Sequence, residues 1–365
     1  MGQVASFGDP NNFESNFAGM PVLVTGHTGF TGGWLSLWLN ALGANVHGLA
    51  LEPVTTPNLF QAAAIGQHLK STLGDIRDFD TVQKAFDAAA PVVVFHLAAQ
   101  PLVSHAYKSP LETFSVNVQG TANVLEAARL SRSVKAVVCV TTDKVYADKD
   151  WHWGYRESDE LGGKDPYSAS KSAAEIIAIS YRKVLAARGN AVRIATARGG
   201  NIIGGGDWSD DRIVPDFVRS LAEGKPLSLR NPDSVRPWQH VLALSHGYLI
   251  LAAALLRHSA AADAWNFGPA DSDARSVGTL VDTLAKSWKS PIVQFGEGTF
   301  AETRFLHLDS AKARAELGWK PALMFAETVK LTAQWYRDYY ANPKSAFELT
   351  VGQISNYRDR LKTSV

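Results

Sequence analysis

A short polar group ends an apolar stretch near the middle of the chain. In "VCVTTDKVYADK", residues 138–149, small and β-branched residues lead directly into Thr142, Asp143 and Lys144. A hydroxyl, a carboxylate and an ammonium in this place are either the solvated end of a strand or the floor of an active site. Beside a reacting substrate, such groups can orient a hydroxyl and transfer protons.

A second pair of residues offers a base. Tyr167 and Lys171 lie four residues apart at the start of a segment with helical spacing, so both side chains point from one helix face. A nearby ammonium stabilises phenolate and lowers the tyrosine pKa from about 10, which makes the phenolate a usable base for a hydroxyl group. Such a pair is common on protein surfaces. Downstream of a nucleotide-binding half and of the strand ending at Thr142, it indicates a catalytic site.

A glycine-rich turn precedes both groups. The segment "TGHTGFTG", residues 25–32, follows the first apolar strand and opens the first helix. Glycine allows a tight turn and close backbone approach, and the helix N-terminus offers free N–H groups to a pyrophosphate. The context at a strand-to-helix junction favours a dinucleotide site over an ordinary turn. The cofactor residues predicted here are Gly26, His27, Thr28, Gly29, Phe30 and Gly32.

The elements around these groups alternate between strand and helix. Strands are predicted at residues 20–26, 45–52, 71–76, 91–99, 135–142 and 191–198, and helices at 32–43, 79–89, 109–130 and 167–189. Nearly continuous apolar strands that alternate with helices predict an α/β fold, a Rossmann-type doubly wound parallel sheet. We expect a flexible tail at residues 1–17 and a nucleotide-binding domain with the catalytic residues at 18–198. A smaller, mixed α/β substrate-binding region at 199–365 is expected to be interleaved with that domain.

Composition excludes several classes of protein. The 365 residues carry a net charge of +1, which gives no support to a nucleic-acid partner. Cys139 is the single cysteine and lies in an apolar run, so we expect a core residue and a cytoplasmic protein. No apolar run approaches the roughly 20 residues of a membrane-spanning helix. The ten histidines show no paired metal-ligand spacing, so no metal is predicted.

The spacing Gly-x-x-Gly-x-x-Gly resembles that of the extended short-chain dehydrogenase/reductase superfamily. Glu52 follows the second strand, where a carboxylate accepts ribose hydroxyls and repels a 2′-phosphate, so NAD is favoured over NADP. The resemblance further implies that the segments after the third and fourth strands contact the cofactor. These contribute Asp75, Ile76, Leu97, Ala98 and Ala99, and the superfamily also places Tyr167 and Lys171 against the cofactor.

Longer segments resemble the sugar-nucleotide 4,6-dehydratases of this superfamily. They include "GHTGFTGGWLSLWL", "TTDKVY", "RGGNIIGGGDW" and "VRPWQHV", and the resemblance extends from about residue 17 to 357. It implies that Thr142 joins Tyr167 and Lys171 in a triad, that Asp143 protonates the leaving C6 hydroxyl, and that Lys144 removes the C5 proton. The best-known branch has glutamate in place of Lys144, and lysine acts as a base only when neutral.

The resemblance is nearest to the branch that dehydrates CDP-D-glucose to CDP-4-dehydro-6-deoxy-D-glucose. It implies a place in dideoxysugar and lipopolysaccharide O-antigen biosynthesis, and a homodimer, with a tetramer left open. Substrate diphosphate requires cations, and the Gly/Asp/Trp-rich segments after residue 199 supply arginines. The substrate-binding residues predicted are Gln100, Asn201, Arg212, Val214, Arg230, Arg236, Asn266 and Arg304.

Three alternatives remain open at this point. A UDP-hexose 4-epimerase shares the glycine turn and the Tyr/Lys pair, but its reaction would give Asp143 and Lys144 no chemical role. A 4,6-dehydratase of another nucleotide sugar would perform the same chemistry. A non-catalytic nucleotide sensor on the same fold would be expected to have a damaged triad, and here Thr142, Tyr167 and Lys171 are all present.

Overall fold

The centre of the molecule is a seven-stranded parallel sheet with helices on both faces. The computed structural model describes residues 7, 13–269, 273–296 and 306–363. The strand order is β11-β6-β5-β4-β1-β2-β3, the doubly wound order extended by one strand. The predicted α/β fold is therefore confirmed. The strands are β1 (Pro21–Thr25), β2 (Asn45–Ala50), β3 (Lys70–Leu73), β4 (Val93–His96), β5 (Ala136–Val140), β6 (Arg193–Arg198) and β11 (Ala264–Asn266).

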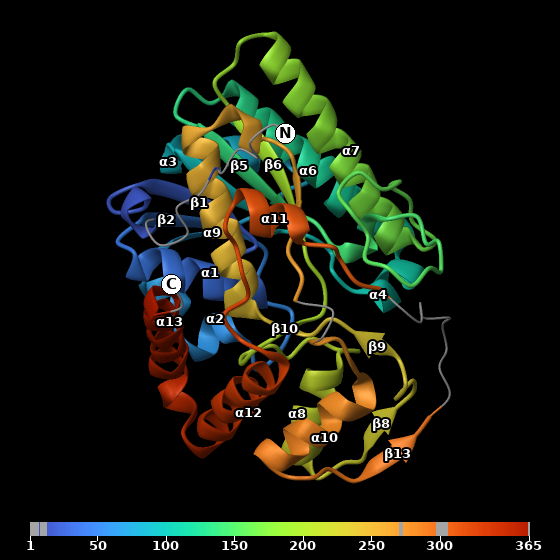
Figure 1. The fold of residues 1–365 in the computed structure, drawn as a ribbon. Coiled ribbons are helices and arrows are strands. Elements are labelled where there is room, and N and C mark those ends of the chain that lie inside the picture. Colours follow the sequence, from blue (N-terminus) through green and yellow to red (C-terminus); the bar gives the residue numbers. More distant parts are fainter. Residues whose placement is uncertain (1–6, 8–12, 270–272, 297–305, 364–365) are drawn as a thin grey trace.

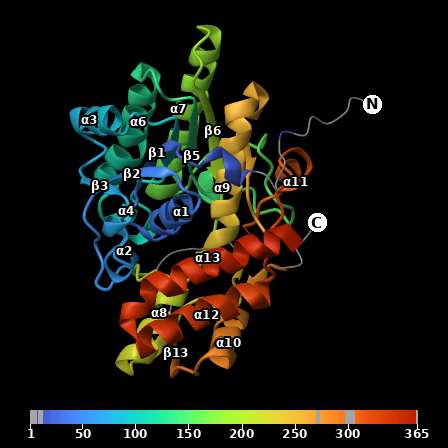
Figure 2. The ribbon, with the colours of Figure 1, turned by 90° about the vertical axis from the view of Figure 1, so that its left-hand side faces the viewer.

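Helices cover the sheet in two layers (Figures 1 and 2). On one face, Leu23 and Val137 belong to a buried cluster with α3 (Phe79–Ala89), α6 (Gly120–Leu130) and α7 (Pro166–Ala187). On the other face, Val22 and Val138 pack in the larger core with α1 (Phe30–Ala41) and α9 (Val241–Arg257). Successive strand residues point to opposite faces, and both faces are buried, so the strands read as continuous apolar runs.

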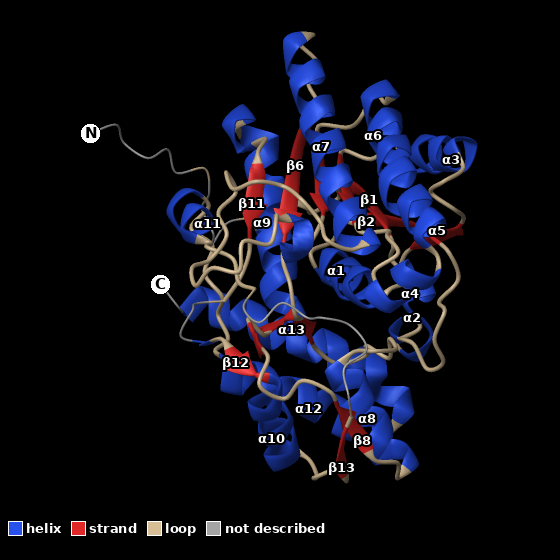
Figure 3. Cartoon of the chain, turned by 90° about the vertical axis from the view of Figure 1, so that its right-hand side faces the viewer, coloured by secondary structure: helices blue, strands red, loops and turns tan. Residues whose placement is uncertain are grey.

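A second lobe lies beneath the carboxyl ends of the strands (Figure 3). It contains α8 (Ile213–Glu223), α10 (Val277–Ser287), α12 (Phe325–Ala341) and three two-stranded pairs. The chain returns to the sheet through α9 and β11 before it re-enters this lobe. The strands of the pairs are β7 (Ile202–Ile203) with β10 (Gln239–His240), β9 (Val235–Arg236) with β12 (Arg275–Ser276), and β8 (Leu227–Leu229) with β13 (Val293–Phe295).

The remaining elements are short or terminal. One expected helix, residues 109–130, is divided into α5 (Pro110–Phe114), a π-helical turn η3 (Ser115–Gln119) and α6. The others are α2 (Leu59–Ala62), α4 (Val103–Lys108), α11 (Ala311–Glu316), α13 (Ala346–Thr363), and the 3-10 turns η1 (Glu14–Asn16), η2 (Ile65–Gln67), η4 (Asp143–Val145), η5 (Ser259–Ala261) and η7 (Pro343–Ser345).

Residues 13–17, expected to belong to a flexible N-terminal tail, are part of the packed structure. Phe13 and Phe17 are buried in the main core, and Glu14 forms a two-pronged ion pair with Arg358 of α13, with Arg358 Nε 2.7 Å from Glu14 Oε1. The prediction failed because "NNFESNF" is polar by composition, whereas its two aromatic rings insert into a core built from distant segments. Residues 1–6 and 8–12 lie outside the described part of the chain.

Candidate active site

Strand β5 ends in a tight 3-10 turn that buries its polar residues. Thr142 caps η4, and its hydroxyl oxygen lies 3.3 Å from the Lys144 backbone N–H that it accepts. The same hydroxyl donates to Asp143 Oδ1 at 3.0 Å. The exposed fractions of Thr142 and Asp143 are only 6% and 4%. The end of this strand is therefore not a solvated strand end at these two residues.

Asp143 packs tightly against residues 199 and 200. Its backbone N–H donates to the carbonyl oxygen of Gly199 at 3.2 Å, and a Cβ on Gly200 would lie 1.8 Å from Asp143 Oδ2. Burial raises the pKa of Asp143, while the charge of Lys144, the Thr142 hydrogen bond and the charge of Arg236 act in the opposite direction. A buried carboxyl group with a raised pKa can hold a proton and donate it, as a general acid must.

Lys144 occupies a different environment. Its side chain is exposed, although its charge is close enough to affect Asp143. The predicted role of Lys144 as the C5 base stays a prediction.

Helix α7 brings the second group to the same strand end. Asp165 caps the helix by accepting from the Ser168 backbone N–H at 2.9 Å, and Pro166 occupies the first turn. One turn later, Lys171 Nζ donates to the carbonyl oxygen of Val140, the last residue of β5, at 3.0 Å. The start of α7 thus places Tyr167 and Lys171 close to the end of β5.

Tyr167 and Lys171 have shifted pKa values. The lowering of the Tyr167 pKa expected from the neighbouring ammonium is not found, because burial raises it to about 12, opposed by a hydrogen bond with Thr142 and by the charge of Arg212. Burial lowers the pKa of Lys171 to about 8. The structure therefore brings Thr142, Asp143 and Tyr167 together. The Lys171 amino group lies next to them, at the carbonyl oxygen of Val140.

The glycine turn fits a closely approaching ligand. Gly26 has φ +80°, and a Cβ there would lie 2.7 Å from the Ala98 backbone nitrogen. A Cβ on Gly32 would lie 2.1 Å from the Gly26 carbonyl oxygen, and Gly29 caps α1 in an extended conformation. The turn is thus folded against the segment after β4, and the N-terminus of α1 opens beside it, as a dinucleotide pyrophosphate requires.

The other predicted cofactor residues lie along the same edge of the sheet. The turn after β1 carries His27, whose Nε2 lies 2.6 Å from Ser71 Oγ, and Thr28, whose hydroxyl donates to the Leu51 carbonyl oxygen at 2.8 Å. Because β4, β1, β2 and β3 are neighbours, all of these groups meet at their carboxyl ends. Around them lie half-buried Phe30, Leu97, Ala98 and Ala99, exposed Glu52, buried Ile76, and Asp75, which accepts from the Arg77 backbone N–H at 2.8 Å.

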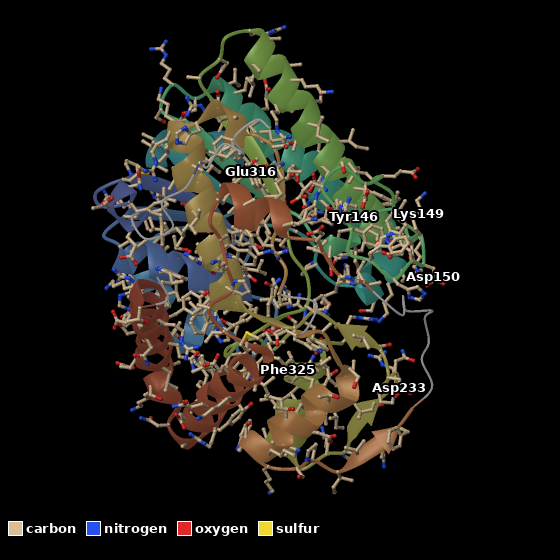
Figure 4. The ribbon with its side chains drawn as sticks, viewed as in Figure 1. Tyr146, Lys149, Asp150, Asp233, Glu316 and Phe325 are labelled. Carbon is tan, nitrogen blue, oxygen red and sulfur yellow. The ribbon has the colours of Figure 1, made fainter. Side chains whose placement is uncertain are left out.

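Two of the predicted substrate arginines reach the catalytic group from the second lobe. Arg212 precedes α8, forms a 2.9 Å ion pair with the buried Asp207, and its charge acts on Tyr167. Arg236 lies in β9, and its charge acts on Asp143. It also lines a cavity of about 320 Å³ with His152 and His307, together with Val235, Pro237, Ala274 and Leu306. In Figure 4, Lys149 and Asp150 mark the segment that follows η4, and Asp233 lies below them in the second lobe.

The remaining predicted substrate residues have varied surroundings. Asn266 is buried, and its side chain accepts from the Tyr146 hydroxyl at 2.7 Å and donates to the Tyr155 carbonyl oxygen at 2.8 Å; its predicted contact with the substrate stays a prediction. Asn201 is half-buried with φ +48°, and Gln100 donates to Thr113 Oγ1 at 2.8 Å. The others are Val214, buried in α8, Arg230, exposed and 3.6 Å from Asp211 Oδ1, and Arg304, which lies outside the described residues.

Reasoning from the sequence missed a buried ion pair behind the predicted catalytic residues. Glu175 of α7 and Arg198 of β6 are both almost completely buried, and Arg198 Nη2 lies 2.8 Å from Glu175 Oε2. The i+4 spacing of Glu175 from Lys171 is the one signal that could have identified it. A second cavity, of about 620 Å³, lies by Arg156, Asp309 and Lys312 and contains none of the predicted site residues.

Two further findings concern the described residues alone. Among them, no three His, Cys, Asp or Glu side chains gather in a way that could hold a metal ion. Within the same part of the chain, no helix has the length and apolar character needed to cross a membrane.

Comparison with known proteins also finds similarity to sugar-nucleotide 4,6-dehydratases. The family model for GDP-mannose 4,6-dehydratase matches residues 23–332. The CDP-glucose 4,6-dehydratase of Salmonella typhimurium is 43% identical over 332 residues, which cover 89% of this chain and 92% of that protein.

Solved structures of similar proteins extend the comparison. A dTDP-glucose 4,6-dehydratase of Streptomyces venezuelae, solved with NAD bound, has a TM-score of 0.76 at 26% identity and covers 88% of this chain and 98% of its own. A UDP-glucose 4-epimerase of Thermus thermophilus, in complex with NAD, has a TM-score of 0.73 at 25% identity and covers 87% and 99%. The chain belongs to the GDP-mannose 4,6-dehydratase family.

Proposed function

We propose that this chain is a hydro-lyase that uses NAD to convert CDP-D-glucose to CDP-4-dehydro-6-deoxy-D-glucose. The observation that carries the reaction type is the buried Asp143 carboxyl group, with a raised pKa, hydrogen-bonded to Thr142 next to Tyr167. A 4-epimerase needs a base and a hydride acceptor, but it does not need this acid. The choice of nucleotide is supported by the 43% identity to a CDP-glucose 4,6-dehydratase.

The cofactor site fits NAD on the geometry of the turn. Gly26 and Gly32 leave no room for side chains where the backbone must approach a pyrophosphate, and Glu52 stands after β2, where ribose hydroxyls would be bound. When bound, NAD supplies a reversible hydride acceptor for C4 and donor for C6. Lys171 and Tyr167 would border the nicotinamide end of the site.

The residues of the chain then divide the proton transfers. Tyr167 takes the O4 proton once it is deprotonated, a form that the Thr142 hydrogen bond and the charge of Arg212 favour against burial. Thr142 also orients the sugar, and the Lys171 ammonium stands one turn further along the same helix. With C4 a ketone, the C5 proton becomes acidic and Lys144 removes it. Asp143 donates its proton to the C6 hydroxyl, which leaves as water.

Once C6 is reduced, which is the chemistry that bound NADH would supply, Lys144 returns its proton to C5. The proton held by Tyr167 restores the acid form of Asp143, so the enzyme and cofactor are unchanged after each turnover. The net change is the loss of one water from the sugar.

Assembly and location belong to the same proposal. Exposed apolar residues on neighbouring helices support a homodimer. Leu111 and Phe114 of α5, with exposed fractions of 82% and 37%, and Ile176 and Val184 of α7, with 58% and 43%, would be covered by a second copy. The single, buried cysteine supports a cytoplasmic enzyme. We place the product in dideoxysugar supply for lipopolysaccharide O-antigen.

The proposal is tested by offering the purified protein CDP-, dTDP-, UDP- and GDP-hexoses in parallel. Mass spectrometry is expected to show the loss of one water from CDP-glucose and much slower conversion of the others. Unchanged mass with an inverted C4 would replace the dehydratase by an epimerase. Dehydration of another nucleotide sugar in preference to CDP-glucose would retain the reaction and reject the substrate.

A further inference from the structure

One buried carboxylate shares the catalytic face of α7. Glu175 lies four residues after Lys171 and eight after Tyr167, and its exposed fraction is 0%. Neither the general base nor the general acid of the proposed mechanism is Glu175. A charge buried to this degree needs partners, and the identity of those partners indicates what it does.

The partners of Glu175 come from the ends of β5 and β6. Arg198 donates to Glu175 through Nε at 2.9 Å and Nη2 at 2.8 Å, which is a two-pronged ion pair. Thr141 donates to Oε1 at 2.5 Å, and Thr196 donates to Oε2 at 2.8 Å. Both carboxylate oxygens are therefore held by residues of β6 and of the segment that directly follows β5, and Thr141 is the neighbour of Thr142.

Arg198 extends the connection across the sheet. Its Nη1 donates to the Tyr146 hydroxyl at 2.7 Å, and its guanidinium carbon lies 4.9 Å from the centre of the Tyr146 ring. The Tyr146 hydroxyl in turn donates to Asn266 of β11 at 2.7 Å. One network thus joins α7, β5, β6, β11 and the segment that follows η4.

Stability alone is a weak reason for such a pair. Removing two charges from water costs several kcal/mol per ion, and well-packed apolar residues of the same volume are often as stable. What an apolar pair would not supply is a fixed distance between the α7 face and the Thr141–Thr142 strand end. Nor would it supply a negative charge near the Lys171 ammonium.

The electrostatic part depends on all the groups that face Lys171. The Glu175 charge favours the ammonium form of Lys171, against the burial that lowers its pKa to about 8. Cys139 of β5 and His96 of β4 also interact with Lys171, and Arg182 of α7 interacts with Glu175. Burial raises the pKa of Cys139 to about 12 and lowers that of His96 to about 3, so both are neutral at working pH and Glu175 is the anion among these groups.

We propose that Glu175, held by Arg198, is a positioning residue that fixes the Tyr167–Lys171 pair over Thr142. This inference rests on the proposed function, because it assigns Glu175 to the base of that reaction. It predicts a charge effect on catalysis that is separable from folding.

The test compares four variants with the parent enzyme. Glu175→Gln removes the charge at constant volume, Glu175→Asp keeps the charge on a shorter chain, and Glu175→Gln with Arg198→Met removes the unpaired arginine. Glu14→Gln is the matched control, because it breaks another two-pronged pair, with Arg358, at the N-terminal turn. Each is measured for Tm, KM, and kcat as a function of pH.

We expect Glu175→Gln to lower kcat by at least tenfold, with KM little changed, and to move the alkaline limb of kcat down by about one pH unit. In Glu175→Asp, kcat should again fall at the same alkaline pH as in the parent enzyme. The double variant should regain the parent Tm, but its kcat should still fall at the lower pH. Glu14→Gln should lower Tm alone. A Glu175→Gln enzyme with the parent pH profile, or a double variant that regains both Tm and the limb, would overturn the inference.

The two proposals fail in different ways. If the parent enzyme does not dehydrate CDP-glucose, the proposed function is rejected before any variant is compared. If the parent is active and the charge has no effect on the pH profile, only the role of Glu175 is rejected.

Discussion

Replacing Asp143 by asparagine separates the two halves of the proposed reaction. Asparagine has nearly the same size, and its amide oxygen can still accept from Thr142, which now donates to Oδ1 at 3.0 Å. Gly200 continues to close over the side chain, so the shape of the site should persist. What is lost is the acidic proton. A positioned general acid contributes about 10²- to 10⁴-fold, which corresponds to about 3–5 kcal/mol of barrier.

Asp143→Asn should therefore oxidise C4 and then stop. In a stopped-flow experiment with CDP-glucose, we expect NADH absorbance to rise and remain, while product forms at least 100-fold more slowly than with the parent. Asp216→Asn is a matched control, since burial also raises the pKa of Asp216, which lies on α8 and binds Arg219. Turnover of Asp143→Asn at the parent rate would refute the assignment of the acid.

The same variant has a signature in stability. Burial holds the pKa of Asp143 above its ordinary value, so the stability that its proton contributes is complete below about pH 4 and is lost as pH rises through the folded-state pKa. Asparagine cannot ionise. The Tm of the variant relative to the parent should therefore increase with pH over this range, and a constant difference would contradict the buried environment.

Three further substitutions test the rest of the site. Tyr167→Phe should retain NAD and reduce C4 oxidation by about 10²- to 10⁴-fold, measured as NADH formation in a single turnover; oxidation at the parent rate would exclude Tyr167 as the base. Gly200→Ala should lower both Tm and turnover, because its Cβ would lie 1.8 Å from Asp143 Oδ2, whereas Gly352→Ala, with open space around it, should change neither. Arg236→Met should raise KM by about 10- to 100-fold, because one hydrogen bond to a charged group is lost. Arg337→Met, at an exposed position, is the control, and an unchanged KM for Arg236→Met would remove Arg236 from the substrate site.

The fold could be predicted because its signals are local. The glycine turn, the apolar strands and the helical spacing after Pro166 each depend on a few neighbouring residues, and β1, β5 and α7 appear within a few residues of their expected bounds. The interruption at Ser115–Gln119 was missed because a π-helical turn has no distinct sequence pattern. Phe13 and Phe17 were assigned to a tail because their partners lie far along the chain.

The site was predictable where a motif fixes the position of a side chain. Tyr167 and Lys171 follow from helix periodicity, and Asp143 follows from its place at the strand end. Arg198 shows the limit of this reasoning. It ends β6, just before the segments predicted to bind the substrate diphosphate, yet the fold directs it inward to Glu175, a contact between residues 23 positions apart. Asn266, predicted to lie near the substrate nucleotide, is likewise fully engaged with Tyr146 and Tyr155.

The path of the hydride tests the central claim most directly. With CDP-glucose that carries deuterium at C4, in ordinary water, the account predicts a product lighter by one water whose deuterium is found at C6 by NMR. In heavy water with unlabelled substrate, one solvent deuterium should enter at C5, through the base. Return of the label to C4, with the sugar mass retained, would contradict the account.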